Sequence, residues 1–369
     1  MHIILFFTFD ISLKNWLDSG LLDREILIYK KLVEKGINVT FVTFGDESDR
    51  LLIPKTNINI IPAYTLMNYS RYKVVRILKS LTIPFRINNE IRQASVLKTN
   101  QLLGSWVPLM AKFLYKKPLY VRTGYDPLIF AIKNRKSYFK RLLYYMLTYF
   151  SLLFSDAYSV SSTSDKEFLN KNYLFVNKNK IFLSPNWVVS RESVKNIDER
   201  VGNRVLTVGR LEKQKNYIKL ISYFQKTDLG LDIVGNGSQY QELKKLGGNV
   251  KFLGKLANED LLDLYQEYKI FVLFSTFEGN PKVILEAMAS GCVVVASDIQ
   301  NNREIISHNI NGYLIDENEN LYEVIENLIS NKKQLFEISK EAQDGISASN
   351  SLEKIFNREV EVISSFYDS

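Results

Sequence analysis

Short runs of consecutive apolar residues recur along the chain, and most are followed by a turn and a segment of helical periodicity. Such runs are typical of strands buried on both faces of a parallel sheet, and their alternation with helices is typical of βαβ units. The strands expected in the first half are 2–9, 37–44, 94–98, 119–122, 156–161 and 181–184. Those expected in the second half are 204–208, 231–234, 250–254, 270–274, 293–296 and 312–315. The pattern predicts an α/β protein that begins the same arrangement twice.

The length of 369 residues and the restart of the pattern favour two domains. The turn Pro185-Asn186-Trp187 indicates the approach to a linker around 188–203. We therefore expect an N-terminal domain over residues 1–190 and a C-terminal domain over residues 191–350.

The stretch 270–297 organises the second half as strand, loop, helix and strand. Asn280 suits the N-cap of the helix, and Pro281 suits its first position, where a missing N–H costs nothing. Gly291 ends the helix, which is apolar nearly all round and is therefore expected to be buried.

Two carboxylates stand out against this apolar background. Glu278 lies after a strand, where open α/β sheets bind ligands, and Glu286 lies inside the buried helix. The free N–H groups at the helix start, at Lys282 and Val283, favour a phosphate. Together these groups fit a nucleotide sugar; the structural alternative is a core carboxylate satisfied by nearby backbone beside a solvated loop glutamate.

Other turns of the second half add positive charge and glycines. Arg210 and Lys215 share one loop after a strand, and they suit a diphosphate because guanidinium binds it bidentately and ammonium adds a point charge. On these residues alone, the alternative of a solvated charged loop is favoured. Gly235-Asn-Gly237 alone indicates only a tight turn.

Glu278 and Glu286, followed by Ala-Met-Ala-Ser-Gly, resemble the Glu–seven residues–Glu signature of retaining glycosyltransferases of family 4. The resemblance covers roughly 204–315 and implies a GT-B fold, in which two Rossmann-like domains face a cleft. It implies that Glu278 holds the donor sugar, that Glu286 holds the ribose, and that Arg210 and Lys215 hold the diphosphate. It further implies donor contacts at Gly209, Gly235, Gly237, Gly254, Gly279, Asn280, Pro281, Lys282 and Val283.

The first half resembles the family only in architecture. A backbone role is carried over to Gly20, where relatives have a glycine pair. Arg122, Tyr125 and Asp126 occupy the place of a histidine beside the donor sugar, although Asp126 with Pro127 equally suits a helix cap. A last helix within 351–369 is expected to pack back on the N-terminal domain.

The resemblance implies transfer of a sugar from a nucleotide-diphosphate sugar, UDP in preference to GDP, to a glycan or lipid-linked acceptor in bacterial-type surface polysaccharide or glycoconjugate assembly. Because Arg210 and Lys215 already supply cations, we expect neither a metal nor another cofactor. Two alternatives remain: a nucleotide-sugar 2-epimerase of the same fold, and a non-enzymatic anion-binding scaffold. Only two histidines and one cysteine, Cys292, are present, which argues against a His-based triad, a zinc site or a disulfide.

Positive charge is concentrated in the first half. Residues 51–150 hold 17 basic and 2 acidic side chains, which suggests an anionic partner such as phospholipid or a lipid-linked phosphate; we expect no nucleic acid. Segments 70–86 and 133–154 mix basic and apolar positions, so each suits either a core helix or an interfacial one. With no signal peptide recognised, we expect a cytoplasmic protein, with peripheral contact to an anionic membrane as one alternative and a soluble acidic glycan as the other.

Overall fold

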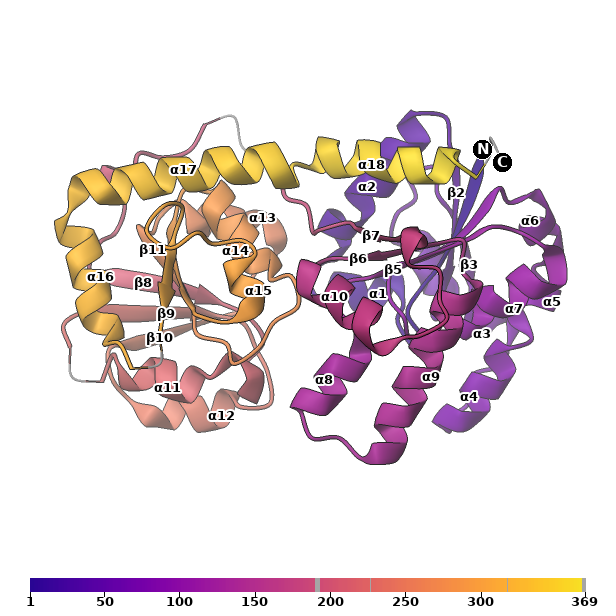
Figure 1. Cartoon of the computed structure of the whole chain (residues 1–369), viewed down its shortest axis with the longest axis horizontal. Coiled ribbons are helices and arrows are strands. Elements are labelled where there is room, and N and C mark those ends of the chain that lie inside the picture. Colours follow the sequence, from indigo (N-terminus) through magenta and orange to yellow (C-terminus); the bar gives the residue numbers. More distant parts are fainter. Residues whose placement is uncertain (190–192, 226, 317, 367–369) are drawn as a thin grey trace. The chain divides into compact units, whose positions relative to one another are not determined.

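The computed structural model describes residues 1–189, 193–225, 227–316 and 318–366. The chain forms two compact units, one of Met1–Pro185 with the chain from Phe356 onward, the other of Asn186–Ile355. Each unit is a parallel sheet flanked by helices (Figure 1). The last helix, α18 (Leu352–Ser364), begins in the second unit and continues in the first. Within the described ranges, no helix has the length and apolarity needed to cross a bilayer.

The N-terminal unit contains a seven-stranded parallel sheet. Its strands are β1 His2–Phe6, β2 Asn38–Thr43, β3 Asn59–Pro62, β4 Val96–Thr99, β5 Leu119–Thr123, β6 Ala157–Val160 and β7 Ile181–Leu183. They lie in the order β3-β2-β1-β4-β5-β6-β7. The sequence pattern missed β3, a short edge strand that ends in a proline, which has no N–H to donate to a ladder and is therefore tolerated at a sheet edge.

The helices of this unit cover the sheet and extend beyond it. They are α1 Leu13–Asp18, α2 Leu22–Glu34, α3 Ala63–Leu66, α4 Lys73–Ser80, α5 Ile83–Arg86, α6 Asn88–Gln93, α7 Trp106–Tyr115, α8 Pro127–Lys133, α9 Tyr138–Phe154 and α10 Thr163–Asn172. The mixed segment 70–86 is therefore two short helices, α4 and α5.

The C-terminal unit repeats the arrangement with six strands. They are β8 Arg204–Val208, β9 Gly230–Val234, β10 Val250–Gly254, β11 Ile270–Leu273, β12 Val293–Ser297 and β13 Tyr313–Ile315. The helices are α11 Tyr217–Ser222, α12 Tyr240–Leu243, α13 Asn258–Tyr265, α14 Lys282–Ala289, α15 Gln300–Arg303, α16 Leu321–Ser330 and α17 Lys332–Asn350. Successive residues of β12 belong to two different cores, Val293 to one and Val294 to the other. The sheet is thus buried on both faces, as continuous apolar runs predict.

The strand order of each sheet reverses direction at its centre. The C-terminal order is β10-β9-β8-β11-β12-β13, so the reversal lies between β8 and β11, and in the N-terminal sheet it lies between β1 and β4. Open parallel sheets bind ligands outside the carboxyl ends of the strands at such a switch point. The loops that follow β8 and β11, and those that follow β1 and β4, are therefore the places to search for a site.

Candidate functional site

Two of the predicted catalytic residues meet at the switch point of the C-terminal sheet. Lys215 lies on the loop after β8, Glu278 lies on the loop after β11, and Lys215 Nζ is 2.6 Å from Glu278 Oε1. Their side chains are only 13% and 8% exposed. Because water screens such a pair little, the ammonium and the carboxylate hold one another in place.

Further hydrogen bonds join the same two loops. The Gln214 side chain donates to the Phe277 carbonyl oxygen at 2.7 Å, and the Thr276 N–H donates to the Gln214 carbonyl oxygen at 2.9 Å. Asn216 ends the first loop in a left-handed conformation with φ of 53°. The position of Glu278 relative to Lys215 is thus fixed by backbone as well as by charge.

Three of the predicted glycines line one pocket. A pocket of about 530 Å³ is bounded by Gly235, Asn236, Gly237, Ser238, Tyr240, Gln241 and Gly254. The Gly235 N–H donates to the Gly254 carbonyl oxygen at 2.7 Å, and a Cβ at Gly235 would lie 1.9 Å from the Gly209 carbonyl oxygen. At φ of 141°, Gly235 can be no other residue without strain. Close backbone packing therefore explains Gly235, and it brings Gly209 beside the pocket.

The start of α14 differs from the sequence prediction. Pro281, not Asn280, is the N-cap, and no side chain caps the first turn. Asn280 instead accepts a hydrogen bond from the Asn186 N–H at 3.1 Å, and its carbonyl oxygen accepts one from Asn186 Nδ2 at 2.8 Å. Lys282 Nζ lies 4.0 Å from the ring centroid of Trp187. A helix start leaves the N–H groups of its first turn, here those of Lys282 and Val283, without intrahelical acceptors, and such a start favours an anion.

The remaining residues predicted to bind the donor are Gly279, Glu286 and Arg210. Gly279 is buried between Glu278 and the helix start. Glu286 is 2% exposed within α14 and is not among the residues that line the pocket. Arg210 is exposed on the loop after β8.

Glu212, on the same loop as Arg210, was not among the predicted residues. Its carboxylate accepts hydrogen bonds from Ser238 N–H at 3.0 Å and Ser238 Oγ at 2.7 Å. These bonds from Ser238, with a smaller contribution from Arg210, lower the pKa of Glu212. Glu212 thereby ties the loop that carries Arg210 and Lys215 to the wall of the pocket. A carboxylate two residues after Arg210 was the only signal in the sequence.

The residues predicted in the N-terminal unit make local contacts within that unit. Gly20, at φ of 65°, ends α1 and donates to the Leu17 carbonyl oxygen at 2.8 Å. Arg122 Nη2 donates to the Ser184 carbonyl oxygen at 3.4 Å, and Tyr125 lies exposed against the ring of Phe130.

Asp126 caps a helix. It is the N-cap of α8, 1% exposed, and accepts from Leu128 N–H at 2.7 Å and Ile129 N–H at 3.3 Å. Its other oxygen accepts from Thr148 Oγ1 at 3.2 Å. Because both carboxylate oxygens are engaged and buried, Asp126 acts as the helix cap that the sequence allowed as the alternative to a substrate contact.

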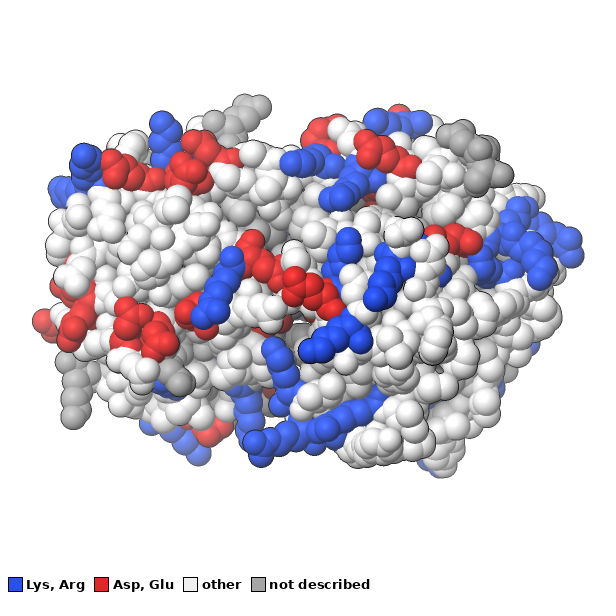
Figure 2. All heavy atoms as spheres, in the orientation of Figure 1, with Lys and Arg blue, Asp and Glu red and all other residues white. Residues whose placement is uncertain are grey.

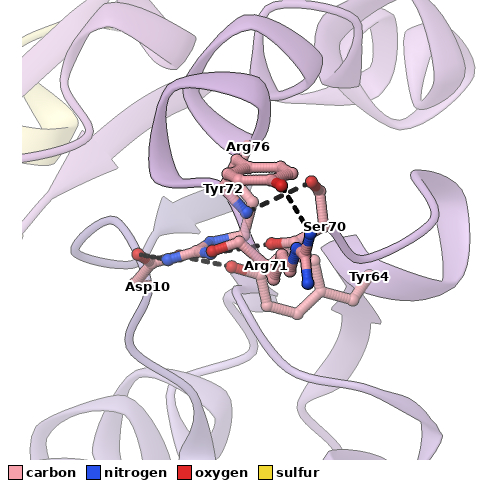
Figure 3. A network of polar contacts seen from close by, with 6 residues as sticks. All are labelled: Asp10, Tyr64, Ser70, Arg71, Tyr72 and Arg76. Atoms are coloured by element: carbon pink, nitrogen blue, oxygen red, sulfur yellow. Dashed lines mark hydrogen bonds and ion pairs between the residues drawn. The ribbon is translucent and has the colours of Figure 1, made fainter.

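A polar network that the sequence reading missed lies beside the switch point of the N-terminal sheet (Figure 3). Asp10 follows β1 in a left-handed conformation, with φ of 63°. Arg76 of α4 grips its carboxylate with two hydrogen bonds, Nε at 2.9 Å and Nη2 at 2.6 Å, and Tyr64 donates a third. Burial opposes the charge, but the hydrogen bonds from Arg76 and Tyr64 outweigh it and lower the pKa of Asp10. We call this the Asp10–Arg76 clamp; it holds α4 against the loop after β1.

The described residues contain no group of three or more His, Cys, Asp or Glu side chains placed to hold a metal ion.

Two sheets with the Rossmann strand order, each with a switch-point loop cluster, define an α/β protein of the paired Rossmann-like class. Residues 191–345 match the family described as glycosyl transferases group 1. The C-terminal unit thus resembles this family, and the whole chain has the GT-B fold.

Three relatives illustrate the similarity. An N-acetylgalactosaminyltransferase of Campylobacter jejuni, whose name specifies a glycan on diphospho-undecaprenol as acceptor, is 30% identical over 51% of this chain and 54% of its own length. An uncharacterised glycosyltransferase of Methanocaldococcus jannaschii is 28% identical over 70% of this chain and 69% of its own. The crystal structure of Anabaena HepE with UDP and glucose aligns over 99% of this chain and 100% of that chain, with a TM-score of 0.76 at 18% identity. The alignment with the Campylobacter enzyme therefore covers only about half of that enzyme's length.

Proposed function

We propose that the chain transfers a sugar from a nucleotide-diphosphate sugar to an acceptor hydroxyl, with retention at the anomeric carbon. The observation that carries this proposal is the pairing of Lys215 with Glu278, beside the uncapped start of α14. A diphosphate bound by Lys215, Arg210 and the first-turn N–H groups would have its sugar next to the Glu278 carboxylate. These donors would stabilise the charge that develops on the leaving diphosphate, which is the main task in such a transfer.

We assign the nucleoside to the adjoining features of the same unit. Glu286 would bind the ribose hydroxyls, and the glycine-lined pocket beside Gly254 would receive the base. We propose UDP over GDP; the nucleotide in the Anabaena structure of the same fold supports this choice.

The acceptor proposed is a glycan or a lipid-linked glycan, in the assembly of bacterial-type surface polysaccharide or glycoconjugate. The lipid-linked acceptor in the name of the Campylobacter enzyme supports it, as does the excess of 17 basic over 2 acidic residues within 51–150. A lipid-linked diphosphate is anionic and lies at the membrane, so we place the enzyme in the cytoplasm, in peripheral contact with the membrane's inner face.

We also propose that transfer needs no metal ion, because Arg210, Lys215 and the helix start supply positive charge at the leaving group. Activity should persist in excess EDTA. Complete loss of transfer in EDTA, with recovery on adding magnesium or manganese, would overturn this point without affecting the assignment of the donor site.

The test of the function is a panel of UDP- and GDP-sugars with glycan and lipid-linked acceptors, in which release of the nucleoside diphosphate and the new glycoside are both measured. Lys215→Ala should abolish release, whereas Lys333→Ala, on the exposed start of α17, should not change it. Isomerisation of the donor sugar without release would indicate the epimerase alternative. If calorimetry detects no nucleotide binding by either the wild type or Lys333→Ala, the non-enzymatic scaffold would be favoured.

A further inference from the structure

The hairpin formed by α8 and α9 carries an exposed apolar stripe. The exposed apolar side chains of α9 are Tyr138, Phe139, Leu142, Leu143, Met146, Phe150 and Leu153. Their spacing of mostly three or four residues places them along one face of the helix. The rest of the helix packs on the N-terminal core, through the buried Leu152 and the half-buried Tyr144 and Tyr145. This helix therefore has a side that packs on the core and a side that is exposed.

Basic residues surround the tip of the hairpin, which we define as residues 132–143. Lys133, Arg135, Lys136 and Lys140 are all exposed, and no acidic residue occurs between Asp126 and Asp156. Tyr138 and Phe139, in the midst of them, are 80% and 73% exposed. Figure 2 shows blue side chains gathered around the turn between α8 and α9, next to a broad uncharged area. The tip thus combines two exposed aromatic side chains with a surrounding ring of basic residues, which we call the basic collar (Lys133, Arg135, Lys136 and Lys140).

The tip lies on the ligand-binding edge of the N-terminal sheet. Helix α8 begins just after β5 ends, and α9 runs back toward β6. With 17 residues, α9 is about 25 Å long, whereas the four residues of β6 span only about 13 Å. The N-terminal end of α9 therefore extends past the carboxyl end of β6.

Helix α4 has an exposed surface of the same composition. Its exposed apolar side chains include Val74 and Leu78, at 68% and 61% exposed, and each is next to a lysine in the sequence, Lys73 or Lys79. In Figure 1 it extends in the same direction as α8 and α9. The Asp10–Arg76 clamp fixes α4 to the loop after β1, at the switch point.

We propose that the hairpin tip docks the N-terminal unit on an anionic lipid bilayer, with Tyr138 and Phe139 in the headgroup region and the basic collar on lipid phosphates. Exposed aromatic and apolar side chains bordered by Lys and Arg are what such a surface binds. A second copy of the chain is disfavoured as occupant, because it would bring an equally positive surface into contact. The inference deepens the proposed function by naming the surface from which a lipid-linked acceptor is reached, but docking itself does not depend on the donor chemistry.

The experiment is co-sedimentation of the full chain with phosphatidylcholine vesicles that contain or lack phosphatidylglycerol, without nucleotide. The chain should pellet with phosphatidylglycerol vesicles at low salt and much less at high salt. Changing both Tyr138→Ser and Phe139→Ser should weaken partitioning by about tenfold. Arg135→Gly should weaken it by about fivefold. Because Arg135 has φ of 50°, glycine there relaxes the backbone, so weaker binding could not be blamed on unfolding.

Matched controls decide among the outcomes. Phe336→Ser removes a phenylalanine 52% exposed on α17 and should leave binding unchanged. A tryptophan placed at Phe139 should be quenched by brominated lipid, and one placed at Phe336 should not. The proposal is wrong if the wild type stays in the supernatant at low salt or if the hairpin variants pellet like it. It is also wrong if the wild type is a dimer in solution that Tyr138→Ser with Phe139→Ser dissociates. Nucleotide titration of each variant tests the donor site separately.

Discussion

Glu278 and Glu286 lie on either side of the start of α14, and their surroundings differ. Glu278 pairs with Lys215 beside the start of α14, whereas Glu286 is 2% exposed within that helix. We expect Glu278→Gln to lower turnover by about 10²-fold with little change in nucleotide affinity, because it removes charge near the reacting sugar. Glu286→Ala should instead weaken nucleotide binding by about tenfold or more, through lost hydrogen bonds to ribose. Steady-state kinetics and calorimetric titration separate the two effects; wild-type affinity in Glu286→Ala would contradict the ribose assignment.

The buried cap Asp126 makes stability depend on pH. Burial raises the pKa of its carboxyl from 3.8 to about 6. The folded chain therefore holds a proton that the unfolded chain has already lost, and stability falls as the pH rises from about 4 to beyond 6. Asp126→Asn keeps a capping oxygen without this titration, so relative to wild type it should gain about 1–3 kcal/mol over that interval.

Urea unfolding at several pH values measures this gain. Asp46→Asn is the matched control, because hydrogen bonds from Ser48 lower the pKa of that exposed cap. Its contribution is lost as the pH falls, which is the opposite sign. Parallel pH profiles for Asp126→Asn and wild type would show that Asp126 does not titrate in this range.

Among the elements, the turn after β9 depends on a glycine for space as well as for backbone conformation. A Cβ at Gly235 would lie 1.9 Å from the Gly209 carbonyl oxygen, whereas at Gly247, also at positive φ, nothing lies within 4 Å. We expect Gly247→Ala to lower the free energy of unfolding by about 1 kcal/mol, and Gly235→Ala by about 3 kcal/mol or more. Gly235→Ala should also lose nucleotide affinity. Thermal melts with and without nucleotide measure both effects, and equal costs at the two positions would show that close packing is not the reason for Gly235.

The helices and strands were largely predictable, because strands that are buried on both faces appear in the sequence as continuous apolar runs. The edge strand β3 escaped because its four residues, ending at Pro62, resemble a turn. The start of α14 was misplaced by one residue because Asn280, a good cap by type, is engaged by Asn186 instead. Such a contact depends on the fold and leaves no local pattern.

The same limit applied to the site. The loop with Arg210 and Lys215 and the two glutamates were predicted as candidates from residue types and from the family resemblance. The pairing of Lys215 with Glu278 joins residues 63 apart, and the grip of Arg76 on Asp10 joins residues 66 apart. Only the strand order brings the loops after β8 and β11 together, so these partners could not be read from spacing.

At the scale of the whole molecule, the last helix completes the N-terminal unit. Lys98 of β4 and Glu359 of α18 form an ion pair at 2.7 Å, with side chains only 2% and 3% exposed. Lys98 Nζ also donates to Asn100 Oδ1 at 2.7 Å and to Tyr29 Oη at 3.2 Å. Burial opposes the charge on Lys98, but Glu359 outweighs it and raises the pKa of Lys98. A strand at the centre of the first sheet therefore carries a buried cation whose counter-charge arrives only with the end of the chain.

Removing one partner of this pair should cost far more than removing both. Glu359→Leu leaves Lys98 buried without its counter-charge and should lower the free energy of unfolding by about 3–5 kcal/mol. Combining it with Lys98→Met replaces both charges by apolar groups and should restore most of that loss. Glu337→Leu removes a partner of the exposed pair Lys333–Glu337, 3.9 Å apart, and should change stability by less than about 0.5 kcal/mol. Urea unfolding of the full chain measures all three; a double variant as unstable as Glu359→Leu alone would show that packing of α18, and not charge compensation, carries the contact.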